Sequence, residues 1–117
     1  MRVDKPWGWY KDLERESDLV IKKIHVKPLR KLSLQKHFKR EEFWYIISGS
    51  GTVTVGNESL LANSGVTFFI EKGEVHRIEA DANGITFVEV QRGECREDDI
   101  YRIEDDYGRA DVKTTDP

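Results

Sequence analysis

The chain has 117 residues, which is enough for one domain with a single core. Its 19 basic and 22 acidic side chains are interspersed and give a net charge of −3, so no nucleic-acid-binding stripe is expected. No apolar run approaches the roughly 20 residues of a membrane-spanning helix. A single cysteine, Cys95, and an N-terminus without the apolar core of a signal peptide together predict a cytoplasmic protein.

Short β-branched and aromatic runs dominate the chain after an aromatic N-terminal segment. Residues 1–18 are expected to form an arm that packs on the body of the domain or on a dimer partner. Strands are expected at 19–26, 43–47, 52–55, 59–62, 66–70, 75–80 and 85–91, with loose alternation over 31–37. Turn residues recur about every eight to twelve positions without helical periodicity. This spacing predicts an all-β sandwich or barrel.

Turns are expected where glycine, asparagine and serine cluster between these runs, at 48–51, 56–57 and 63–65. A further turn is expected at 71–74, around Gly73, and residues 81–84 are expected to form a loop. A short helix or turn is expected over 97–100, where acidic residues favour a helix start. We place one domain at 1–110, followed by a frayed polar tail over 111–117.

Four potential metal ligands stand in two glycine-bracketed stretches. Side chains of a strand alternate faces, so Gln35 and His37 point the same way. Glu42 begins the next strand, and His76 follows a glycine turn on a later one. Taken singly, a histidine at a strand end is more often a hydrogen-bonded or surface residue. The joint pattern favours a site for divalent zinc, manganese, iron, cobalt or nickel, with positions left for substrate.

The two stretches resemble the paired motifs of the cupin superfamily, G(x)5HxH(x)3–4E(x)6G and G(x)5PxG(x)2H(x)3N. His37, Glu42 and Gly49 match the first motif, in which Leu29 replaces the first glycine and Gln35 the first histidine. Gly65, Gly73 and His76 match the second, in which Glu71 replaces proline and Ala80 replaces asparagine. The resemblance implies a double-stranded β-helix, the small jelly-roll barrel of cupins.

A narrower resemblance is to type II mannose-6-phosphate isomerase. It rests on residues 2–10, 32–35, 73–77 and 104–109, and on Arg40, Glu42 and Trp44. In that family the cupin usually forms the C-terminal part of a bifunctional enzyme with a mannose-1-phosphate guanylyltransferase domain, and this chain would be the cupin alone. The resemblance implies interconversion of mannose 6-phosphate and fructose 6-phosphate.

Isomerisation of this kind needs a Lewis acid and a base that moves a proton between two carbons. Lys39 is a candidate base if the strand continues past His37, and a solvated turn residue if it does not. Glu89, another candidate catalytic residue, lines the barrel or lies on its outer face. Arg40, also a candidate catalytic residue, and Arg77 are candidate bidentate phosphate clamps.

The remaining substrate contacts expected are Trp44, from the resemblance, and Tyr10. Tyr10 belongs with Trp7 and Trp9 to an aromatic cluster that suits either sugar stacking or packing in a core or dimer.

Two other functions are compatible with the same residues. One is a non-catalytic cupin that binds a sugar or sugar nucleotide, and the other is a small metal-dependent oxygenase. Lys36, Lys39 and Arg40 favour an anionic substrate over the oxygenase. The expected partners are a sugar phosphate and a second copy of the chain in a homodimer, without nucleic acid or membrane.

Overall fold

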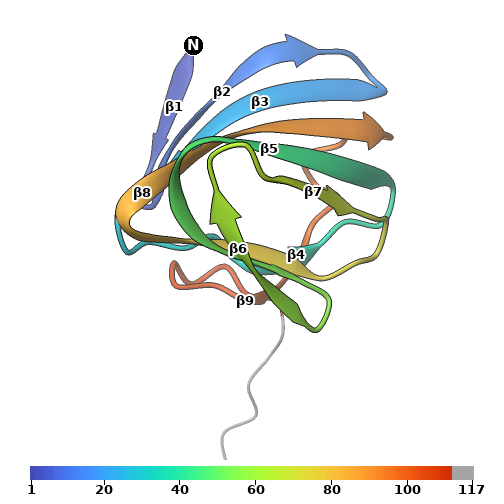
Figure 1. Ribbon diagram of the computed structural model, residues 1–117. Coiled ribbons are helices and arrows are strands. Elements are labelled where there is room, and N and C mark those ends of the chain that lie inside the picture. Colours follow the sequence, from blue (N-terminus) through green and yellow to red (C-terminus); the bar gives the residue numbers. More distant parts are fainter. Residues whose placement is uncertain (112–117) are drawn as a thin grey trace, which may run out of the picture.

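The structure is a computed structural model, and it describes residues 1–111 (Figure 1). Most of the tail predicted to fray, residues 112–117, therefore lies outside the described residues. The chain forms the strands β1 (Arg2–Lys5), β2 (Gly8–Arg15), β3 (Leu19–Val26), β4 (Leu34–Lys36), β5 (Arg40–Val55), β6 (Glu58–Asn63), β7 (Thr67–Ile70), β8 (His76–Gly93) and β9 (Tyr101–Glu104). Within residues 1–111 no helix is long and apolar enough to cross a membrane.

Two long antiparallel strands, β5 and β8, organise the barrel (Figure 1). The first half of β5 pairs with the second half of β8, in the layer that contains β1, β2, β3 and β7. The second half of β5 pairs with the first half of β8, in the layer that contains β4, β6 and β9. Each long strand therefore belongs to both layers, as expected for a double-stranded β-helix.

A glycine corner replaces two of the connections expected from the sequence. Residues 48–51 and 81–84, expected as a turn and a loop, are bends inside β5 and β8. Gly49 has a φ of 82°, and a Cβ there would lie 2.1 Å from the carbonyl oxygen of Gly84. Only glycine allows the two backbones to approach so closely while they bend.

The two ends of the chain add strands that the sequence pattern did not indicate. Residues 2–15, expected as an arm, form β1 and β2 and extend the sheet beyond β3. β9 pairs with β4, so that Arg102 lies opposite Gln35. β1 and β9 are short and largely polar, so alternation of apolar and polar residues does not reveal them as strands.

The interior of the barrel is apolar over most of its length. Trp44, Ile46, Ile85 and Phe87 are at most 1% exposed and form one cluster. Burial of this kind stabilises the fold by about 25 cal/mol per Å² of apolar surface. The same inward faces of β5 and β8 carry Arg40, Glu42, Glu89 and Gln91 at one end, also buried. This polar end is where the candidate site lies.

Candidate metal centre

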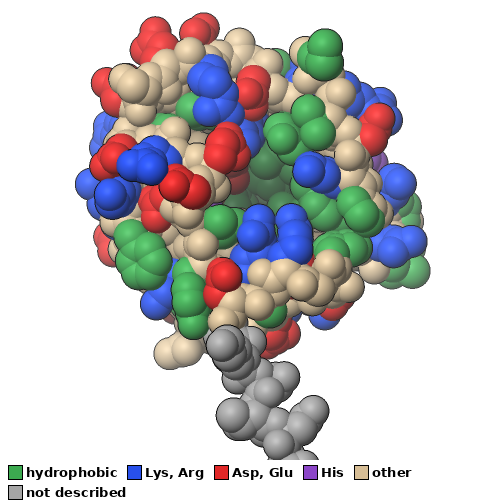
Figure 2. Space-filling view, turned by 180° about the vertical axis from the view of Figure 1, so that it is seen from behind, with side chains coloured by type: hydrophobic (Ala, Val, Ile, Leu, Met, Phe, Trp, Pro, Cys, Tyr) green, Lys and Arg blue, Asp and Glu red, His purple; other side chains and the backbone are tan. Residues whose placement is uncertain are grey.

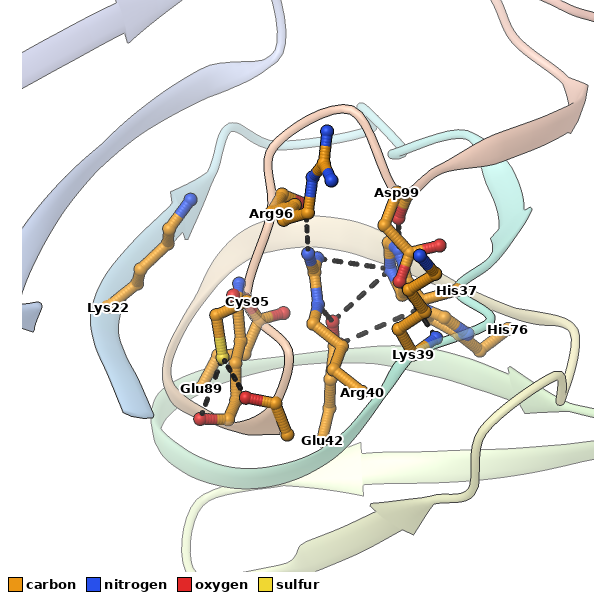
Figure 3. Close-up of polar contacts among 12 residues, drawn as sticks. Lys22, His37, Lys39, Arg40, Glu42, His76, Glu89, Cys95, Arg96 and Asp99 are labelled. Carbon is orange, nitrogen blue, oxygen red and sulfur yellow. Dashed lines mark hydrogen bonds and ion pairs between the residues drawn. The ribbon is translucent and has the colours of Figure 1, made fainter. Parts of the chain in front are cut away.

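His37, Glu42 and His76 converge in the barrel, with ligand atoms within 4.8 Å of one another (Figure 3). His37 Nε2 lies 3.2 Å from Glu42 Oε2, and His76 Nε2 lies 3.7 Å from Glu42 Oε1. All three side chains are at most 3% exposed. The sequence predicted that these three residues lie close together, and the structure places them so.

Strand register accounts for this convergence. Glu42 faces inward because it shares a face of β5 with the buried Trp44 and Ile46. His76 begins β8, paired on one side with Val55 of β5 and on the other with Gln35 of β4. The chain leaves β4 directly into His37, which therefore lies beside His76, with ring centroids 5.0 Å apart.

Gln35, the fourth expected ligand, lines the pocket beside the cluster. Its Oε1 accepts a 2.7 Å hydrogen bond from the hydroxyl of Ser33. Gln35 as a direct ligand therefore stays a prediction.

Both imidazoles turn the same nitrogen toward the centre. Nδ1 of His37 donates to the carbonyl of Asp99 at 2.7 Å, and Nδ1 of His76 donates to the carbonyl of Glu74 at 2.9 Å. A carbonyl can only accept, so each Nδ1 carries the proton and each Nε2 keeps its lone pair. Burial lowers the pKa of both rings, to about 4 for His37, where Arg40 contributes further. Both rings are therefore neutral near pH 7.

The donor set fits a divalent transition-metal ion. Nε2 of His76 is buried and has no hydrogen-bond partner among residues 1–111. Two imidazole lone pairs and a carboxylate thus face one another, an arrangement of acceptors that a cation would satisfy. The carbonyls that hold each Nδ1 are the outer contacts usual for histidine ligands.

Arg40 already contacts this centre. Its Nε donates to Glu42 Oε2 at 3.0 Å, its Nη2 lies 3.3 Å from His37 Nε2, and its Nη1 donates to the carbonyl of Arg96 at 3.2 Å. The Arg40 guanidinium and a bound metal would share the same acceptors. Arg40 therefore lies at the centre, and its expected roles as a phosphate clamp and catalytic residue stay predictions.

Trp44 supports the centre rather than lining the pocket. Its indole N–H donates to Glu42 Oε1 at 3.0 Å, and its ring packs edge-on against His76 and beside Phe87. Only 1% of the residue is exposed. The expected contact between Trp44 and substrate is therefore not available, because β5 places Trp44 beyond Glu42 in the apolar interior.

A pocket of about 190 Å³ opens beside the centre, and Figure 2 shows a hollowed face with lysine and arginine side chains around it. Trp7 and Tyr10 line it together with Gln35 and His37. Tyr10 also carries the ammonium of Lys22 over its ring at 4.7 Å. The cations along the pocket are Lys5, Lys22, Arg40, Arg102 and Arg109, and its carboxylates are Glu89 and Glu97. This composition favours a small anionic ligand.

Glu89 lines the pocket from β8, on the inner face of the barrel. Burial and, after it, the negative charge of Glu42 raise the pKa of its carboxyl to about 7. Gln91 donates to Glu89 Oε2 at 2.7 Å. Glu89 therefore changes protonation near neutral pH, which suits a group that accepts and returns a proton.

Besides Trp44, two expected site residues do not line the pocket. Lys39 is exposed, and its Nζ lies 3.7 Å from Glu94. Lys39 was a candidate base only if the strand continued past His37, and the chain turns there instead. Arg77 follows His76 on β8 and hence faces the other side of the strand, where it donates to the carbonyl of Leu32 and to Glu104.

Sequence reasoning missed Lys22 and Arg102. Lys22 alternates with the buried Val20 and Ile24 on β3, so strand parity could have indicated that it points inward. Arg102 offered no such signal, because β9 was not recognised as a strand. Nε of Arg102 is buried without a hydrogen-bond partner in the part of the chain that the structure describes.

The acidic motif 104–109 acquires a structural role. Glu104 pairs with Arg77 at 3.2 Å, which ties β9 to β8. Asp105 accepts from the backbone and guanidinium of Arg109, and this contact holds Arg109 at the pocket.

Comparison with known proteins agrees with the fold and narrows the family. The family model described as mannose-6-phosphate isomerase C-terminal matches residues 1–105. The xanthan biosynthesis protein XanB of Xanthomonas campestris pv. campestris (strain B100) is 40% identical over 111 residues, or 93% of this chain and 24% of that protein. The mannose-1-phosphate guanylyltransferase ManC of Salmonella typhimurium is 35% identical over 110 residues, or 92% of this chain and 23% of that protein. The chain thus spans about a quarter of these relatives.

Solved structures of similar fold include an RmlC-like cupin. KdgF from Halomonas sp. superposes with a TM-score of 0.76 at 16% identity, covering 84% of this chain and 91% of that one. An RmlC-like cupin from Shewanella frigidimarina gives a TM-score of 0.75 at 18% identity, covering 84% of this chain and 86% of that one. The predicted all-β cupin fold is confirmed.

Proposed function

This chain belongs to the mannose-6-phosphate isomerase C-terminal family, and on that premise we propose that it is a metal-dependent isomerase of mannose 6-phosphate and fructose 6-phosphate. The observation that carries the proposal is the convergence of His37, Glu42 and His76 beside a cation-lined pocket that also holds Glu89. Metal ligands, a proton acceptor and an anion site are the three requirements of this reaction.

His37, Glu42 and His76 would hold the metal, with Gln35 as the predicted fourth ligand. A bound divalent ion would supply Lewis acidity toward the substrate oxygens on the two reacting carbons. The apolar packing of Trp44 against His76 limits the movement of this ligand.

Glu89 is the proposed base that moves the proton between the two carbons. Its carboxyl lines the same pocket as His37, and its pKa of about 7 allows it to take up and give back a proton near neutral pH. Gln91 holds one carboxyl oxygen, which fixes the direction of the group. Lys39, the other candidate base, points toward Glu94 at the surface.

The substrate phosphate would bind the cationic side of the pocket. Arg102 is the strongest candidate anchor, because its buried Nε lacks a partner among the described residues and its side chain lines the pocket. Arg109 and Lys22 line the same space. A pocket of about 190 Å³ lies below the roughly 300 Å³ at which drug-sized ligand sites begin, which suits a small polar substrate.

Two further predictions from the sequence, the homodimer and the cytoplasmic location, stay predictions. The guanylyltransferase activity for which the relative ManC is named belongs to a protein about four times longer than the matched segment.

An assay with defined metals tests the proposal. The protein is stripped with a chelator, reloaded separately with zinc, manganese, cobalt, nickel or iron(II), and incubated with mannose 6-phosphate while phosphorus NMR follows fructose 6-phosphate. We expect turnover with at least one metal, loss of turnover in His76→Ala, and retention in His25→Ala, whose ring bonds Thr86 instead. Absence of turnover with every metal would contradict the isomerase. If mannose 6-phosphate still bound, the non-catalytic cupin would be the better assignment.

A further inference from the structure

The segment between β8 and β9, residues 94–100, crosses over residues 37–40 (Figure 3). Asp99 makes three hydrogen bonds to three successive residues of that stretch. Its Oδ1 accepts from the backbone N–H of Phe38 at 2.9 Å, and its Oδ2 accepts from the backbone N–H of Lys39 at 2.9 Å. Its own carbonyl accepts from His37 Nδ1 at 2.7 Å.

The carboxylate and the carbonyl of Asp99 have different effects. The carboxylate satisfies the two N–H groups of the turn that follows His37, and an ionised acceptor makes these bonds stronger than neutral ones. The carbonyl requires a proton on His37 Nδ1, which leaves the Nε2 lone pair free to face Glu42. The carboxylate thus holds in place the carbonyl that sets the tautomer.

The neighbouring contacts show why this carboxylate matters. Residues 94–100 are otherwise joined to residues 37–40 by the bond from Glu94 N to Lys39 O at 3.0 Å, by the bond from Arg40 to the Arg96 carbonyl, and by the ion pair between Lys39 and Glu94. Of these residues only Arg40 also reaches the His37 ring, with its Nη2 3.3 Å from Nε2, and none of them contacts Nδ1. Without the Asp99 side chain, only the carbonyl contact itself would hold Nδ1 of His37.

We infer that Asp99 is a positioning residue for the metal centre, which fixes the tautomer and direction of His37 through the turn at Phe38 and Lys39. This inference rests on the proposed metal-dependent function. Outer contacts of this type typically change metal affinity 10- to 100-fold when they are removed.

Three variants separate positioning from general stability. Asp99→Ala removes both side-chain acceptors, while Asp99→Asn keeps one oxygen and should recover part of the effect. Asp98→Ala is the matched control, because Asp98 is exposed and its side chain bonds only Arg96 among residues 1–111. Thermal unfolding of each variant shows whether it folds, and Asp99→Asn decides if Asp99→Ala does not.

Two measurements test the inference. Nitrogen NMR of the chelated protein should show His37 protonated at Nδ1 in the wild type and in Asp98→Ala, and a mixture of tautomers in Asp99→Ala. Chelator competition with zinc should show affinity lowered 10- to 100-fold in Asp99→Ala, less in Asp99→Asn, and within about twofold in Asp98→Ala.

An unchanged His37 tautomer in a folded Asp99→Ala, or equal effects at Asp98 and Asp99, would overturn the inference. Failure of the wild type to bind any metal would instead contradict the proposed function. The tautomer measurement on the metal-free protein would still decide the role of Asp99.

Discussion

The interior of the barrel has two regions along β5 and β8 that are equally buried and chemically opposite. The polar end contains Arg40, Glu42, Glu89 and Gln91, and the apolar end contains Ile46, Val53, Ile85 and Phe87. Glu42 is 1% exposed and Gln91 is 2% exposed, while Ile46 and Phe87 are fully buried. Both sets occupy the inward positions of the same two strands.

This difference shows where the fold tolerates a functional site. Burying charged groups is costly unless they are paired, and at the polar end Arg40 pairs with Glu42 while Gln91 pairs with Glu89. The apolar end supplies the stabilising burial that offsets the remaining cost. Trp44 joins the two regions, because it packs on Phe87 and donates to Glu42.

The largest effect is expected at Glu89, in the polar end. Glu89→Gln keeps the shape of the side chain but removes the proton acceptor, so kcat should fall by about 10²- to 10⁴-fold. Metal affinity should change far less, because Glu89 is outside the ligand cluster. Steady-state kinetics checks this, with Lys39→Met as a control whose activity should match the wild type. A larger loss in the Lys39 variant would reverse the assignment of the base.

The apolar end should respond in stability. Phe87→Ala removes a fully buried ring and should lower the free energy of unfolding by about 3–5 kcal/mol. Phe69→Ala, at a residue that is 51% exposed, should cost less than half as much. Urea denaturation measures both. Equal losses would mean that the barrel interior does not dominate the stability.

Acid should have opposite effects on stability through the lowered pKa values of His37 and His76 and through the raised pKa of Glu89 in the chelated protein. The pKa of His37 is lowered from 6.5 to about 4 by burial, so its contribution to stability declines as pH falls from 6.5 to 4. The pKa of Glu89 is raised from 4.5 to about 7, so its contribution grows as pH falls from 7 to 4.5. The two slopes oppose each other, and each reaches at most about 1.4 kcal/mol per pH unit.

Glu89→Gln removes the second of these slopes, and it also removes the Glu89 charge that raises the pKa of His37. The variant should therefore lose stability relative to the wild type as pH is lowered through this range, which urea titrations at several pH values would detect. Parallel pH profiles for the two proteins would show that these groups do not titrate as described.

The smallest effect is expected at Leu29, outside both regions. Leu29 has a φ of 62°, the single non-glycine residue with a positive φ among residues 1–111, and it is 77% exposed. The left-handed conformation costs a residue with a side chain roughly 1–2 kcal/mol. Glycine avoids this cost, but glycine also loses more backbone entropy on folding, which offsets part of the gain. Leu29→Gly should raise the free energy of unfolding by about 1 kcal/mol. Leu61→Gly, equally exposed but within β6, should lower it.

The same comparison explains what the sequence could indicate. The convergence of His37, Glu42 and His76 could be predicted because strand alternation and flanking glycines place these residues at fixed positions. The bend at Gly49 could not be predicted, because a glycine cluster is compatible with a turn between two strands and with a bend inside one. The prediction that Lys39 could face the same way as His37 was wrong for a related reason, because the chain turns immediately after His37.

Other residues depend on contacts that no local pattern encodes. Arg102 reaches the pocket only because β9 pairs with β4, and Asp99 reaches His37 only because residues 94–100 cross over the turn. Leu29 stands where the first motif has a glycine, and the structure has a positive φ there, which was not predicted from the sequence.

Diffraction from crystals grown with manganese or zinc tests the central claim most directly, through an anomalous difference map at the metal absorption edge. The account predicts one strong peak bonded to Nε2 of His37, Nε2 of His76 and a carboxylate oxygen of Glu42, with Arg40 moved off His37 Nε2. A map without a peak between these three side chains, at full metal loading of the solution, would contradict it.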